Sequence, residues 1–160
     1  EHKDSMGNGS VLRYGDVQRM SAGSGVVHSE FNHSKTEQVH FLQIWIMPNT
    51  ANDAPGYEEK HFDVESKKSR LRLIASPDGR DGSVSLRQEA SIFAAILDGA
   101  DEVAHAIAPG RQLYVHVIRG SVKLNGTELS GGDAAHVDKE AAIRLTDARD
   151  SEVLVFDLPY

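Results

Sequence analysis

The sequence predicts an all-β protein built as a sandwich or barrel. Short segments rich in Val, Ile and Leu recur along the 160 residues, and Gly and Pro, present 14 and 5 times, punctuate them. Amphipathic helical patterns are scarce. Asn125-Gly126, between two alternating segments, is a strong signal for a β-hairpin because a type I′ turn needs positive φ at both central residues. A chain of this length can form one large core or two small ones.

Four segments in the first part of the chain are expected to be strands or parts of strands. They are residues 1–5, followed by a turn at 6–9; residues 11–20, broken at 14–16; residues 26–31, after a glycine loop at 21–25; and residues 39–47. The last, "VHFLQIWIM", is the strongest prediction, because both of its faces are largely apolar, as in a strand covered on both sides. Pro48 should end it.

The rest of the chain divides into a polar segment and a second set of strands. Residues 49–69 carry Pro55, Gly56 and charged runs, and we interpret them as a linker. The strands that follow are expected at residues 70–75, 84–88, 91–97, on both sides of Asn125-Gly126, at 141–145 and at 153–158. The segment 91–97 is rich in Ala, which leaves a helix open as an alternative.

Composition limits the possible partners. The formal net charge is -7, whereas nucleic-acid-binding proteins carry basic patches, so we expect no direct binding to nucleic acid. No apolar run reaches the roughly 18 residues that span a bilayer, so we expect no membrane partner. The chain has no cysteine, which excludes disulfides and thiolate metal sites and fits a reducing compartment such as the cytoplasm.

His28 and Glu30 are the candidate metal ligands. Two residues apart on a strand, their side chains point to the same face. Inside a barrel, an imidazole nitrogen and a carboxylate oxygen could reach one ion, and such mixed donors suit Fe(II), Mn(II), Ni(II), Cu(II) or Zn(II). Taken without further information, the same pair is also typical of a solvated strand end.

The remaining histidines are interpreted as structural or exposed. We expect exposed positions for His2 and His33, and a hydrogen-bonded place in the core for His40. His105, His116 and His136 could be imagined as a second metal set, but their spacing does not favour one.

Several stretches resemble the pirin family of the cupin superfamily. They are "HKDSMGN", "MSAGSGVVHSEFN", "HFLQIWIMP", "SPDGRDGS" and "SEVLVFDLP". The resemblance departs from the second cupin motif in two ways: Ser21 stands where Pro is usual, and four residues rather than two separate Gly23 from His28. It implies cupin barrels, with residues 1–48 as the remainder of an N-terminal, metal-binding cupin, 49–69 as a linker and 70–160 as a complete C-terminal cupin.

The resemblance also implies a metal and an activity. In the family, one divalent metal, often iron, is held by three histidines and a glutamate, and His28 and Glu30 match two of these four. The other two belong to a His-x-His motif that this chain lacks, so we expect an incomplete, weak site and a missing upstream segment. Unpaired strands left by such a gap would favour self-association.

The resemblance is compatible with two different functions. The first is a metal-dependent dioxygenase acting on a flavonol such as quercetin, with iron(II) expected and zinc, copper, nickel or manganese as alternatives. Glu30 would then be the catalytic base, because a carboxylate beside an open metal site can accept the substrate's hydroxyl proton. The second is a non-enzymatic, metal- or redox-responsive protein that regulates a partner, in the manner of a transcription co-regulator.

Overall fold

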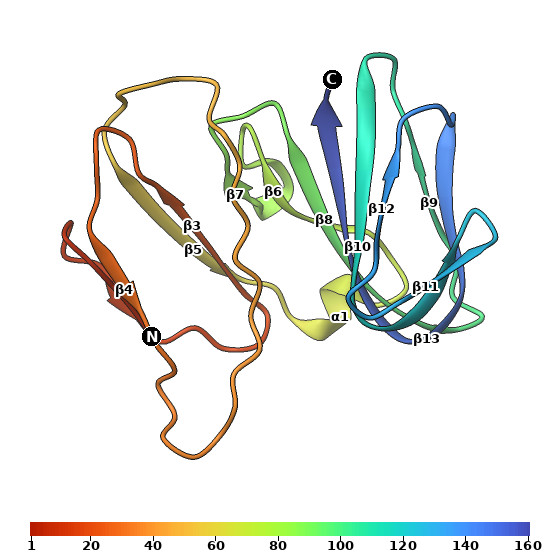
Figure 1. The fold of residues 1–160 in the computed structure, drawn as a ribbon, viewed down its shortest axis with the longest axis horizontal. Helices are drawn as coiled ribbons and strands as arrows, with labels where there is room; N and C mark the ends of the chain where they lie inside the picture. Colours follow the sequence, from red (N-terminus) through yellow and green to blue (C-terminus); the bar gives the residue numbers. More distant parts are fainter.

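The computed structural model describes residues 1–160 and is almost entirely β, which confirms the predicted fold class (Figure 1). Its strands are β1 His2–Asp4, β2 Gly9–Ser10, β3 Asp16–Ser21, β4 His28–Glu30, β5 Gly56–His61, β6 Arg72–Ser76, β7 Val84–Ser85, β8 Ser91–Gly99, β9 Val103–Ala106, β10 Arg111–Leu124, β11 Thr127–Ser130, β12 Ala134–Val137 and β13 Ala142–Pro159. The helical elements are α1 Val64–Lys67 and the short 3-10 turn η1 Arg80–Gly82. Neither has the length and apolar character needed to cross a bilayer.

The C-terminal part of the chain forms one large sheet that curls on itself (Figure 1). Its strand order is β11-β10-β13-β8-β6-β7, with β12 paired to β10 and β9 paired to β13. The hairpin between β10 and β11 turns at Asn125 (φ 47°) and Gly126 (φ 86°), as the Asn-Gly signal predicted. The Ala-rich segment is the strand β8, so the helical alternative is wrong.

Two hydrophobic clusters lie on opposite faces of this sheet. Along β13, Val153 and Val155 belong to a 13-residue cluster inside the curled sheet, whereas Leu154 and Phe156 belong to an 8-residue cluster on the other face. Successive side chains of a strand point to opposite faces, so a central strand covered on both sides is apolar throughout. The second cluster also contacts Val17 and Ile46, and it therefore joins the large sheet to the N-terminal part of the chain.

The N-terminal part contains two small antiparallel sheets (Figure 1). One has the order β2-β1-β4, and the other pairs β3 with β5. β5 lies within the segment 49–69 that we interpreted as a linker, and its six residues pair with all six of β3. The sequence did not indicate a strand at residues 56–61. The charged side chains of this segment suggested a solvated loop, but they make hydrogen bonds within the fold. Glu58, for example, accepts from Arg19 and from Ser85 on neighbouring strands.

The strand expected at residues 39–47 is absent. These residues have no assigned strand and take part in no backbone–backbone hydrogen bond. Trp45 and Met47 are 88% and 82% exposed, and His40 is exposed rather than in the core. A strand is defined by hydrogen bonds to a neighbour, and no neighbouring strand pairs with this segment. An apolar pattern favours a strand, but the segment becomes one only if a neighbouring strand pairs with it.

Candidate metal centre

Pairing between β1 and β4 brings the candidate site together. In this antiparallel register His2 lies opposite Glu30, and Asp4 lies opposite His28. Directly opposed residues share a face of the sheet, and residues two apart on one strand do so as well. All four side chains therefore project from the same face. This arrangement was expected for His28 and Glu30, and the structure adds His2 and Asp4 to it.

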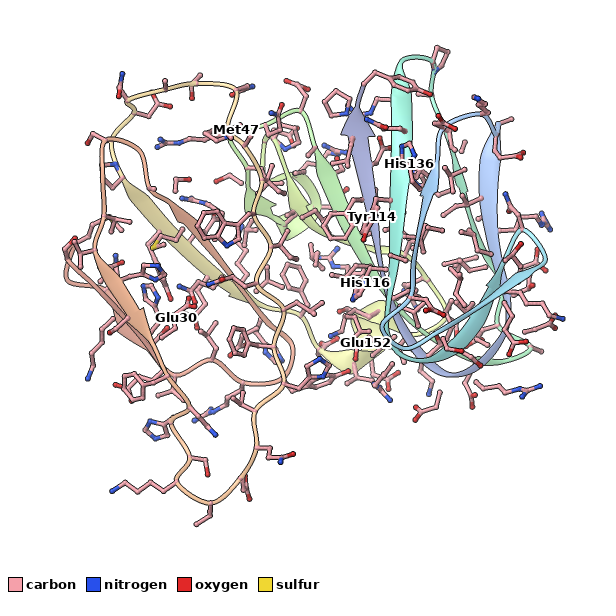
Figure 2. All side chains as sticks on the ribbon, in the orientation of Figure 1. Glu30, Met47, Tyr114, His116, His136 and Glu152 are labelled. Atoms are coloured by element: carbon pink, nitrogen blue, oxygen red, sulfur yellow. The ribbon has the colours of Figure 1, made fainter.

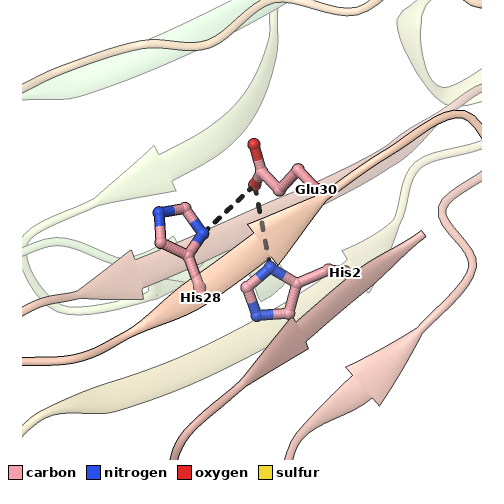
Figure 3. A group of neighbouring side chains, drawn as sticks. All are labelled: His2, His28 and Glu30. Atoms are coloured by element: carbon pink, nitrogen blue, oxygen red, sulfur yellow. Dashed lines mark ion pairs between the residues drawn. The ribbon is translucent and has the colours of Figure 1, made fainter.

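Three of these side chains converge closely enough to share one ion (Figure 3). Oε1 of Glu30 lies 3.7 Å from Nδ1 of His2 and 3.9 Å from Nδ1 of His28. The candidate ligand atoms of the three residues all fall within 4.8 Å of one another. No other group of three potential ligands in the chain does so. The side chains of His28 and Glu30 are 32% and 30% exposed, so the group is open to solvent on one side.

His2 is the residue that sequence reasoning missed. We expected it to be exposed, but its side chain is fully buried. The expectation was wrong because β1 is the central strand between β2 and β4, and because Tyr57 stacks on the imidazole at 5.2 Å between ring centroids. The sequence did hold a signal: His2 and Asp4 are spaced like His28 and Glu30, so both pairs place two polar side chains on one face of a strand.

Asp4 fixes the orientation of His2. Oδ2 of Asp4 lies 3.3 Å from Nε2 of His2, and the carboxylate also accepts hydrogen bonds from the backbone of Met6 and from the backbone and side chain of Asn8. Burial alone would raise the pKa of Asp4, but these hydrogen bonds outweigh it and lower the pKa to about 2. An ionised carboxylate only accepts, so a hydrogen bond between the two residues requires the proton on Nε2 of His2.

Nδ1 of His2 is consequently available to the site. It is buried and has no hydrogen-bond partner. With Nε2–H directed to Asp4, Nδ1 of the imidazole faces Glu30, the carboxylate–histidine arrangement that commonly orients metal ligands. Buried polar atoms are rarely left unpaired, so the orphan nitrogen fits a site built for an additional atom.

Glu30 is held on its other side by Gln43. Nε2 of Gln43 donates to Oε2 of Glu30 at 3.0 Å, and Oε1 of Gln43 accepts from the indole of Trp45 at 3.3 Å. Oε1 of Glu30 therefore stays turned toward the two imidazoles while Oε2 is occupied. Two imidazole nitrogens and one carboxylate oxygen suit a borderline divalent metal and leave coordination positions open.

The other histidines do not form a second centre. His105 pairs with Asp157 at 2.9 Å, and His136 bonds the side chain of Gln112 at 2.6 Å. His116 is part of neither contact. His33 is exposed as expected and pairs with Glu1 at 2.8 Å.

Comparisons with known proteins assign both parts of the chain to described protein families. Residues 73–158 match the family described as quercetinase C-terminal cupin domain, and residues 1–46 match the family described as pirin. The large curled sheet is therefore a cupin domain, and β1 and β4, which carry the candidate site, lie in the part matched to pirin.

Individual relatives agree with this class. The chain is 42% identical to a quercetin 2,3-dioxygenase of Escherichia coli (strain K12), over 99% of this chain and 68% of that protein. It superimposes on the crystal structure of YhhW from Escherichia coli with a TM-score of 0.92, at 42% identity, covering 99% of this chain and 66% of that one. The bacterial pirin YhhW of Escherichia coli in complex with nickel(II) gives a TM-score of 0.91 at 40% identity, over 99% and 67% of the two chains.

The chain belongs to the pirin family of cupin proteins, and it spans about two thirds of the length of these relatives.

Proposed function

We propose that His28 and Glu30 bind one divalent metal ion, with Nδ1 of His2 as a third donor. The single observation that carries this proposal is the convergence of the three ligand atoms within 4.8 Å, including a buried nitrogen with no partner. A pirin of known structure from Escherichia coli has been crystallised with nickel(II), which supports a metal in this family. Iron(II) is our proposed physiological metal, with nickel, zinc, copper and manganese as the alternatives that these donors also suit.

We further propose that the metal-loaded protein is a dioxygenase that opens a flavonol such as quercetin. The 42% identity to a quercetin 2,3-dioxygenase supports this substrate class. The metal would bind the substrate's oxygens and hold it beside dioxygen. Within the chain, Glu30 accepts the proton of the flavonol hydroxyl, and Gln43 steadies the carboxylate through its 3.0 Å hydrogen bond while this happens. Asp4 holds the imidazole of His2 in place.

The test is quercetin consumption followed by absorbance under air. Protein loaded with iron(II) should consume quercetin, and both chelation of the metal and Glu30→Gln should reduce the rate by at least about 100-fold, the usual contribution of a general base. The variant His33→Gln, at an exposed histidine outside the cluster, is the matched control and should keep the wild-type rate. Turnover that survives both metal removal and Glu30→Gln would reject the proposal. Tight metal binding without turnover of any flavonol would instead favour a regulatory protein.

We also propose that two copies of the chain associate through residues 39–47. The backbone of this extended segment makes no hydrogen bond to other backbone groups, and its large apolar side chains are mostly exposed. Backbone groups without hydrogen-bond partners in such an apolar segment favour pairing with a strand of another copy. Light scattering should show a dimer that Phe41→Lys converts to a monomer; a wild-type monomer at every concentration would reject the proposal.

The proposed setting is the cytoplasm, with a small aromatic molecule rather than nucleic acid as the partner. The absence of cysteine and the net charge of -7 support both parts. Cell fractionation with an antibody to the protein would test the location, and a shift assay with double-stranded DNA at low salt should show no complex.

A further inference from the structure

A cleft separates residues 42–47 from the outer face of the large sheet. Its volume is about 610 Å³, and nine of its 14 lining residues are hydrophobic. The side formed by the sheet comes from β10 and the end of β13, including Tyr114, His116 and Phe156. Figure 2 shows Tyr114 and His116 on the side of β10 that faces the segment carrying Met47. The volume is typical of sites for small organic molecules, which are commonly about 300–1,000 Å³.

The cleft contains polar groups that have no partner within the protein. Neither the hydroxyl of Tyr114 nor the ring of His116 makes a hydrogen bond. The three amides that line the cleft are already used. Gln43 donates to Glu30 and accepts from Trp45, and Gln88 donates to the carbonyl of Met47. Gln112 donates to the carbonyl of Pro159 and accepts from His136. A ligand would therefore find two free polar groups, both on β10.

The remaining lining sets the chemical class of the ligand. No Asp, Glu, Lys or Arg lines the cleft, so a charged molecule would lose water without gaining an opposite charge. The rings of Tyr114 and Phe156 meet edge to face, with centroids 5.8 Å apart and planes at 65°. Aromatic side chains pack favourably with a further ring in such offset or edge-on positions.

We propose that this cleft binds an uncharged planar aromatic molecule through a hydroxyl group that bonds Tyr114 and His116. The cleft adjoins the metal centre through Gln43, which lines it and donates to Glu30, but the proposed ligands His2, His28 and Glu30 do not line it. Its occupation does not depend on the proposed dioxygenase activity. Residues from the N-terminal part of the chain form one wall and the C-terminal cupin domain forms the other, so a bound ligand would contact both.

The test is calorimetric titration with two probes, 2-naphthol and naphthalene, which differ only in the hydroxyl. Wild-type protein should bind 2-naphthol about fivefold more tightly than naphthalene, the effect of one hydrogen bond of ordinary strength. Tyr114→Phe should remove most of that difference by weakening 2-naphthol binding alone. Ile44→Arg, which puts a charge at an apolar wall position, should weaken both probes at least about tenfold.

Matched controls separate this site from the rest of the molecule. Tyr160→Phe makes the same chemical change at a tyrosine 70% exposed outside the cleft and should leave both affinities unchanged. The 2-naphthol affinity should also be the same in chelator-treated and nickel-loaded protein. Circular dichroism should show that each variant is folded. The proposal is overturned if 2-naphthol does not bind, if its binding requires nickel, or if Tyr114→Phe and Ile44→Arg both bind it like the wild type.

Discussion

Nε2 of His2 lies 3.3 Å from Oδ2 of Asp4, so a buried carboxylate orients a buried imidazole whose other nitrogen faces Glu30. Both residues come from the three-residue strand β1, and both lie on the face that β4 completes with His28 and Glu30. The candidate centre is thus assembled from two short neighbouring strands. Asp4 orients His2 but is not itself a proposed ligand of the ion.

Replacing Asp4 should weaken metal binding without removing a proposed ligand. Asp4→Asn keeps the shape of the side chain but weakens the hold on His2, and partners of this kind typically change metal affinity 10- to 100-fold. We expect nickel(II) affinity, measured by titration calorimetry, to fall by at least about tenfold.

The matched control for this variant is Asp16→Asn. Asp16 also pairs with a histidine, His61, at 2.7 Å, but that histidine is 59% exposed and outside the cluster. The nickel affinity of Asp16→Asn should therefore equal that of the wild type. An equal loss in both variants would mean that Asp4 has no specific role at the metal centre.

Glu58 should make stability depend on pH. Its carboxylate accepts hydrogen bonds from the backbone and hydroxyl of Ser85 at 2.8 and 2.7 Å and pairs with Lys60 at 2.9 Å. Burial alone would raise the pKa of Glu58, but these contacts and Arg19 outweigh it and lower the pKa from 4.5 to about 2. Because the pKa is lower in the folded state, the contribution is complete above the unfolded value and is lost as the pH falls from about 4.5 toward 2.

The measurement is urea unfolding of the wild type and Glu58→Gln between about pH 7 and pH 3. The wild type should be more stable by about 1.5–3 kcal/mol near pH 7, the range for hydrogen bonds to a charged group, and the difference should shrink below about pH 4.5. Glu65→Gln, at an exposed glutamate of α1 without a side-chain hydrogen bond, should show no such difference. A constant difference across the whole range would contradict the assignment.

Gly23 should tolerate no side chain. It has φ +55°, and a Cβ atom there would lie 2.2 Å from the carbonyl oxygen of Asp53. Gly25, two residues on, also has positive φ (+137°) but has open space around the Cβ position. Both substitutions to Ala incur backbone strain of about 1–3 kcal/mol, and only Gly23→Ala adds a collision with backbone.

The measurement is the Tm of the two variants, Gly23→Ala and Gly25→Ala, by thermal unfolding. Gly23→Ala should lower Tm clearly more than Gly25→Ala, because the glycine loop before β4 must pass against residues 53–54. If both variants lower Tm equally, the close approach at Gly23 is not a constraint on the fold.

Features that depend on local chemistry were predictable from the sequence. The Asn125-Gly126 turn follows from the φ values that these two residues adopt easily, and the shared face of His28 and Glu30 follows from strand geometry. The all-β class follows from the spacing of short apolar segments and turn residues.

Features that depend on distant partners were not predictable. His2 is buried only because β1 lies between β2 and β4, and nothing local to His2 encodes that neighbourhood. The charged strand β5 resembles a linker until its pairing with β3 is known. Residues 39–47 show the converse case, since their apolar pattern favours a strand but no strand pairs with them. The division of the chain into domains at 48 and 70 stays a prediction.

Nickel(II) titration of three single variants tests the central claim most directly. The wild type should bind one equivalent, while His28→Ala, Glu30→Gln and His2→Gln should each weaken binding at least about tenfold. The loss of a donor should cost no less than the loss of a hydrogen-bond partner of a donor, which is typically about 10- to 100-fold. The exposed histidine variant His33→Ala should bind like the wild type. Wild-type affinity in all three cluster variants would contradict a metal centre at His2, His28 and Glu30.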